Sequence, residues 1–128
     1  MKSSASKSNV KREQKTALFL REISQLIQRL SLDELDLSKI FVTKVKLSKD
    51  YSICYVYLST YTDEKEDFEK ALEILKLYKP SLRKALAKLI PGRYVANLRF
   101  LYDTSKEKER RITKLLEQIS EEEKYQDE

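Results

Sequence analysis

The residues best suited to binding chemistry lie between Leu75 and Tyr102, where seven Lys and Arg side chains occur without a single Asp or Glu. They are Lys76, Lys79, Arg83, Lys84, Lys88, Arg93 and Arg99. Generic protein surfaces mix the two signs, so a block of one sign on ordered structure predicts a polyanionic partner such as RNA. The alternative, a solvated helix face without a partner, is the less favoured interpretation.

Like charges also recur at helical spacing within this block. Lys79 with Arg83, and Lys84 with Lys88, are i, i+4 pairs, and each pair costs an isolated helix a small amount of free energy. An external anion would offset that cost, which favours the binding interpretation.

The composition excludes most catalytic sites. The chain has no His, one Gly and one Cys, which removes the commonest general base and metal ligand, any Gly-rich phosphate loop and any disulfide framework. The carboxylate pair Asp63 and Glu66 is better explained as a helix cap, and Cys54 as a small buried hydrophobe. We therefore expect no enzyme, no cofactor and no metal.

Two helices are expected to carry the basic block. Phe68, Ala71, Leu72 and Leu75 form an amphipathic stripe, and Leu82, Ala85, Leu86 and Leu89 repeat it. Pro80 lies between the stripes, lacks a backbone N–H and pushes Lys79 out of the α region. The pattern predicts helices over 64–77 and 80–90, with a kink at Tyr78, Lys79 and Pro80.

The other elements follow from periodicity and turn residues. One helix is expected over 10–31, capped by Ser8 or Asn9. Another is expected after Thr104, whose spacing to Glu107 indicates a capping box. Strands are expected over 40–48, 51–60 and 94–102. The first two strands, joined by a short turn, must be antiparallel, and the third joins through a helical crossover. The fold class is therefore α+β, a three-stranded sheet covered by helices, which is the layout of a type II KH domain that binds single-stranded nucleic acid.

Side-chain alternation predicts which residues of each strand and helix are buried and which are exposed. The first strand is expected to bury Phe41, Thr43, Val45 and Leu47 and to present Lys44 and Lys46 outward. Tyr55 and Tyr57 point away from the Val56 side of the second strand, where they either stack on bases or, as we favour, pack beneath a flanking helix. The last helix carries Ile112, Leu115, Leu116 and Ile119, a stripe expected to dock on the sheet.

Charge divides the chain of 128 residues, whose net charge is +5, into three parts. Residues 1–8 are expected to be a flexible basic arm, residues 9–119 the folded domain, and residues 120–128 an acidic tail. Lys11 and Arg12 extend the basic arm as further candidate RNA contacts. No apolar run reaches membrane-spanning length and no hydrophobic signal core is present, so we expect a cytoplasmic protein without membrane contact.

Several segments in unbroken order resemble the ribosome-binding factor A family. They are Val42 to Asp50, Cys54 to Ser59, Leu82-Arg83 with Leu86-Ala87-Lys88, Leu98-Arg99-Phe100 with Asp103-Thr104-Ser105, and Arg111-Ile112 with Leu115-Leu116. The resemblance covers residues 9–119. It implies a KH-like fold and a non-catalytic factor, expected to be a monomer, that binds the small (30S) ribosomal subunit and helps to mature 16S rRNA, with other assembly factors as further partners.

One departure from the family concerns the kink. The family has an Ala-x-Gly kink in place of the KH Gly-x-x-Gly loop, whereas this sequence has Tyr78-Lys79-Pro80. Pro80 bends a helix by a different physical route, so the fold prediction stands, but the larger Tyr78 alters how a phosphate approaches. Arg83 matches the family's arginine on the second helix. A second hypothesis is a protein–protein adaptor that acts on the ribosome through the acidic C-terminal helix.

Overall fold

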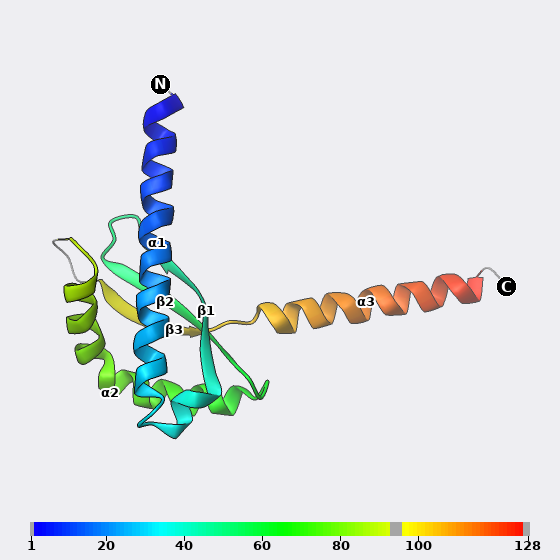
Figure 1. Ribbon diagram of the computed structural model, residues 1–128. Helices are drawn as coiled ribbons and strands as arrows, with labels where there is room; N and C mark the ends of the chain where they lie inside the picture. Colours follow the sequence, from blue (N-terminus) through cyan, green and yellow to red (C-terminus); the bar gives the residue numbers. More distant parts are fainter. Residues whose placement is uncertain (1, 93–95, 127–128) are drawn as a thin grey trace.

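The computed structural model describes the backbone of residues 2–92 and 96–126 and the side chains of residues 10–92 and 96–121. Its elements, in chain order, are α1 (Lys2–Leu30), the 3₁₀ helix η1 (Leu35–Lys39), β1 (Ile40–Leu47), β2 (Ile53–Thr60), α2 (Lys65–Leu89), β3 (Asn97–Tyr102) and α3 (Ser105–Gln126). The predicted α+β class is confirmed. Figure 1 shows α1 and α2 against the sheet and α3 leading away from it.

The sheet has the strand order β1-β2-β3. β1 and β2 form the expected antiparallel hairpin, and β3 pairs in parallel with β2. A parallel pair needs a crossover, and α2 provides it, as predicted.

The core lies on one face of this sheet, which we call the inner face. Cys54, Val56 and Leu58 of β2 are completely buried there, as their alternation predicted. Phe19, Ile23 and Ile27 of α1 and Phe68, Ala71, Leu75, Leu82 and Leu86 of α2 complete the same hydrophobic cluster. Because both helices pack on the inner face, the prediction that Tyr55 and Tyr57 lie beneath a flanking helix is wrong.

A β-bulge changes which residues of β1 are buried. The register shifts between Val42 and Lys44, and the extra residue is Thr43. Ile40, Val45 and Leu47 are buried, whereas Phe41 and Thr43 are only half-buried. The predicted inner face of Phe41, Thr43, Val45 and Leu47 is therefore wrong at its first two positions, because a bulge reverses the alternation of every residue before it.

α2 is a single helix that contains Pro80, not the two helices predicted. Figure 1 shows that it changes direction part-way along. Proline removes one hydrogen bond to the preceding turn and its ring crowds that turn, which bends a helix without ending it when both halves are held by packing. Leu75 before Pro80 and Leu82 after it are both buried, so each half is held.

The ends of the chain differ most from the predictions. α1 begins at Lys2, so the predicted start near residue 10 and caps at Ser8 or Asn9 are wrong. α3 leaves its apolar stripe in solvent, with exposed fractions of 57% for Ile112, 58% for Leu115, 60% for Leu116 and 50% for Ile119. The predicted docking of this stripe on the sheet is therefore wrong.

Turn residues precede α3 and β3. The Thr104 carbonyl accepts the first hydrogen bond of α3, from the Lys108 N–H at 3.0 Å, so Thr104 holds the predicted N-cap position, and Asp103 supports the turn before it by accepting a 2.9 Å hydrogen bond from the Ser105 N–H. Gly92 has φ = 153°, a backbone conformation that L side chains rarely adopt, so it provides the freedom predicted for the Pro91-Gly92 turn. Residues 93–95, with Arg93 and part of the third predicted strand, lie outside the described residues.

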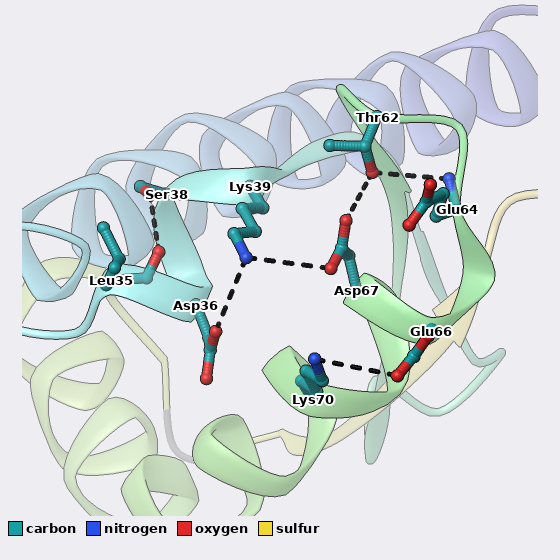
Figure 2. Close-up of polar contacts among 9 residues, drawn as sticks. All are labelled: Leu35, Asp36, Ser38, Lys39, Thr62, Glu64, Glu66, Asp67 and Lys70. Atoms are coloured by element: carbon teal, nitrogen blue, oxygen red, sulfur yellow. Dashed lines mark hydrogen bonds and ion pairs between the residues drawn. The ribbon is translucent and has the colours of Figure 1, made fainter.

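A polar cluster fastens the start of α2, and Figure 2 shows it. Asp67 is buried with 7% exposure; its carboxylate accepts a 2.5 Å hydrogen bond from the Thr62 hydroxyl and lies 3.8 Å from Lys39 Nζ. Thr62 Oγ1 also accepts from the Glu64 N–H at 3.3 Å. The N-cap of α2 is Glu64, which makes no side-chain cap hydrogen bond, so the predicted cap at Thr62 or Asp63 with Glu66 is wrong.

Candidate nucleic-acid interface

The half of α2 that follows Pro80 places lysines outward because its apolar positions face inward. Leu82 and Leu86 are buried, which leaves Lys84 and Lys88 exposed on the solvent side and Lys79 half-buried at the bend. Within the described side chains, no hydrogen bond or ion pair engages these three lysines. We call Lys79, Lys84 and Lys88 the α2 lysines. They are cations whose charge is available to an external anion.

Two other predicted residues of α2 are less available. Lys76 forms an ion pair with Glu73 at 3.3 Å, but both side chains are mostly exposed, so the pair contributes little and gives way easily. Arg83 is half-buried and takes part in contacts with its own chain. Its side chain therefore belongs to the packing of the bent helix as well as to the basic block.

The bend itself is fixed by Tyr78. Its hydroxyl donates a 3.0 Å hydrogen bond to Glu34 Oε1, which raises the pKa of Tyr78 because the neighbouring carboxylate disfavours the phenolate. The ring packs against the core and lines a cavity of about 300 Å³ with Leu26, Leu30 and Leu82. The Tyr78-Lys79-Pro80 segment thus ties the bend to the end of α1.

Arg12 does not face a partner, because it joins α1 to the β1–β2 turn. Its guanidinium donates to the backbone carbonyls of Leu47 and, at 3.1 Å, of Ser48, and it lies 5.2 Å from the centre of the Tyr51 ring. Lys15 Nζ approaches the same ring at 4.5 Å. Arg12 is therefore a structural residue in this conformation, while Lys11 beside it is exposed.

Arg99 lies away from the α2 lysines. It is exposed on β3, and the register places it beside Tyr55, on the face of the sheet opposite the core. α2 packs on the inner face, so the predicted residues do not form one continuous surface. Lys44 and Lys46 were predicted to point outward but were not part of the predicted site; they pair with Tyr57 and Tyr55, so they lie on the same face of the sheet as Arg99.

No group of three His, Cys, Asp or Glu side chains able to hold a metal is present among the described residues, and none of the described helices is long and apolar enough to cross a membrane. Burial raises the pKa of the Cys54 thiol to about 12, so it is not a nucleophile at neutral pH.

Comparison with known proteins identifies the family. The sequence profile described as "Ribosome-binding factor A" matches residues 11–116. The chain belongs to the ribosome-binding factor A family. A ribosome-binding factor A from Syntrophomonas wolfei is 35% identical over 115 residues, covering 89% of this chain and 93% of the relative. One from Dictyoglomus thermophilum is 32% identical over 109 residues, covering 85% of this chain and 90% of the relative.

Solved structures of the ribosome-binding factor A family share the fold. The crystal structure of ribosome-binding factor A from Thermus thermophilus has a TM-score of 0.61 and 31% identity, and the match covers 71% of this chain and 93% of that one. A homology model of the Thermus thermophilus factor, fitted into a cryo-EM map of its complex with the 30S subunit, has a TM-score of 0.57 and 31% identity over 70% of this chain and 92% of that one.

Proposed function

We propose that this chain is a non-enzymatic assembly factor that binds 16S rRNA in the small ribosomal subunit and assists its maturation. Family membership supports the class of function, and the Thermus thermophilus factor was fitted into a map of a 30S complex. The single observation that supports the RNA contact is the set of α2 lysines, which form no ion pair with a carboxylate among the described residues.

The chemistry of such a contact is the pairing of ammonium groups with phosphates. Each phosphate that a lysine neutralises releases condensed counterions, so binding weakens as salt rises, by about 0.7 in the log–log slope per single-strand contact. Three α2 lysines therefore account for about 2 in that slope. The bend at Pro80 presents Lys79 and Lys84 on a rigid support, because Leu75 and Leu82 hold the helix on both sides of it.

The test is co-sedimentation with purified small subunits. The variant carries Lys79→Glu, Lys84→Glu and Lys88→Glu; Arg83 stays unchanged because its side chain contacts the body of the protein. The matched control carries the same three charge reversals at the exposed Lys65, Lys108 and Lys114, so both variants have the same net charge.

We expect the α2 variant to lose binding while its melting temperature stays near that of the parent, and the control to sediment with the subunit. Single Lys→Gln changes at the α2 lysines should each lower the salt slope by about 0.7. An α2 variant that still co-sediments would refute the assignment of this surface, and equal losses in both variants would show that only total charge matters.

One observation favours a second function, that of a protein–protein adaptor. Ile112, Leu115, Leu116 and Ile119 form an apolar stripe that α3 holds in solvent. Deleting residues 111–128 leaves the 2.6 Å ion pair between Arg110 and Asp63 in place. Full binding of the shortened chain to small subunits supports the RNA function, whereas lost binding with the α2 lysines intact supports the adaptor.

A further inference from the structure

The face of the sheet opposite the core, which we call the outer face, carries aromatic and cationic side chains from all three strands. It presents Lys44 and Lys46 from β1, Tyr55 and Tyr57 from β2, and Arg99 and Leu101 from β3. The three cations are exposed and the two tyrosines are half-buried. α1 and α2 both pack on the inner face, and Figure 1 shows α3 leading away, so these side chains face solvent.

The strand register arranges these side chains in two rows across the sheet. Tyr55 pairs with Lys46 on one side and Arg99 on the other. Tyr57, two residues along, pairs with Lys44 and Leu101. Neighbouring strands lie about 4.8 Å apart and residues i and i+2 about 7 Å apart, so each ring has a cation within reach and the two rings lie close together.

The three cations differ in how far the protein's own groups engage them, and the charge of Lys44 already helps to lower the pKa of the Asp103 carboxyl. Lys44 Nζ lies 4.6 Å from the centre of the Tyr57 ring, a cation–π contact. The nearby Asp103 carboxylate accepts hydrogen bonds from the Thr43 hydroxyl at 2.5 Å and the Ser105 N–H at 2.9 Å, which fixes it at the start of α3. Lys46 and Arg99 take part in no ion pair among the described side chains.

A sheet face that contacts only water needs polar side chains, and charged side chains alone would keep it solvated. Two adjacent tyrosines on the central strand, flanked by cations on both neighbouring strands, add flat stacking surfaces that solvation does not require. This combination is how sheet-based modules hold unpaired RNA: rings stack on bases, and Lys and Arg pair with the phosphates.

We propose that the outer face binds a single-stranded segment of RNA, with bases stacked on Tyr55 and Tyr57 and phosphates paired with Lys46 and Arg99. The proposal rests on the proposed function for the identity of the partner as RNA. Its geometry is independent of the α2 lysines, which lie on the other side of the sheet. Duplex RNA has its bases stacked on each other and offers none to these rings, so the site selects unpaired RNA.

The test measures binding of the full chain to a fluorescently labelled, mixed-sequence RNA of twelve nucleotides, as a single strand and as a duplex. One variant carries Tyr55→Leu and Tyr57→Leu, which keep apolar bulk but remove the rings. The matched control carries Tyr55→Phe and Tyr57→Phe, which keep the rings and remove only the hydroxyls. A third variant, Lys46→Gln with Arg99→Gln, tests the phosphate contacts.

We expect the leucine variant to bind the single strand on the order of a hundredfold more weakly, about tenfold per ring, while the phenylalanine variant binds as the parent does. The glutamine variant should lower the salt slope by about 1.4, for two phosphate contacts. Photocrosslinking of the parent chain to the same RNA containing 4-thiouridine should label Tyr55 or Tyr57, a result that does not depend on how the variants fold.

A leucine variant that binds the single strand as the parent does, equal affinity for duplex and single strand, or crosslinks confined to α2 would each overturn the proposal. Capture of a protein by this face, with no single-strand binding, would overturn it as well. The proposed function fails separately, through continued co-sedimentation of the α2 variant with small subunits.

Discussion

Replacing Thr62 with Val should destabilise the protein more than removing the charge of Lys39, although both side chains contact the same carboxylate of Asp67. The Thr62 hydroxyl donates at 2.5 Å to a side chain that is 9% exposed, and a hydrogen bond to a charged acceptor contributes about 1.5–3 kcal/mol. Lys39 lies 3.8 Å from Asp67 and is itself 39% exposed, so water screens the pair to roughly 0–1 kcal/mol.

The unfolding free energy from urea titration at pH 7 measures both costs. We expect about 2 kcal/mol for Thr62→Val and below about 1 kcal/mol for Lys39→Met, which keeps the length of the side chain. Thr62→Ser, which keeps the hydroxyl, is the matched control and should cost little. In a domain of this size 2 kcal/mol lowers the melting temperature by about 8 °C.

The reasoning is refuted if Lys39→Met costs as much as Thr62→Val, because Coulomb attraction would then outweigh the hydrogen bond. Equal costs for Thr62→Ser and Thr62→Val would refute it as well, since the hydroxyl would then contribute nothing. In either case the contacts drawn in Figure 2 would not explain how the start of α2 is fastened.

Two further predictions concern titratable groups. Burial alone would raise the pKa of Asp103, but hydrogen bonds from Ser105 and Thr43, with the charge of Lys44, lower it from 3.8 to about 2. The ionised carboxylate of Asp103 therefore stabilises the fold above pH 4, by about 1 kcal/mol after screening, and this stabilisation is lost as the pH falls from 4 to 2. The difference in unfolding free energy between the parent and Asp103→Asn should shrink over that range. A difference that widens would contradict the lowered pKa. Cys54 is completely buried with a pKa of about 12, so a chromogenic disulfide reagent at pH 8 should label it only in denaturant, and rapid labelling of the native protein would contradict its burial.

The strands and their pairing could be predicted because their signal is local. Cys54, Val56 and Leu58 alternate with bulkier polar residues, and a short turn joins β1 to β2, which fixes an antiparallel pair. The β-bulge could not be predicted. Ile40 and Val42 are as apolar as Phe41, so two opposite alternations fit the first half of β1 equally well, and only the packed core decides between them.

The helices show a similar limit. An apolar stripe indicates which side of a helix avoids water, but not what covers it, so the pattern of Leu115 and Ile119 on α3 did not reveal that the stripe stays exposed. The same holds for the basic residues. In the sequence Arg12 cannot be distinguished from the other cations of the basic arm. Its hydrogen bond to the carbonyl of Ser48, 36 residues away, exists only because of the fold.

The topology explains why two separate surfaces exist. β2 and β3 pair in parallel, which requires a crossover between them, and α2 makes that crossover over the inner face, where α1 also packs. With both helices on one side, the outer face stays open and its residues are free to be polar, cationic or aromatic. The α2 lysines and the Tyr55–Arg99 row therefore point to opposite sides of one three-stranded sheet. A single RNA strand that reached both would have to pass around an edge strand, so we expect the two surfaces to contact different segments of the same rRNA.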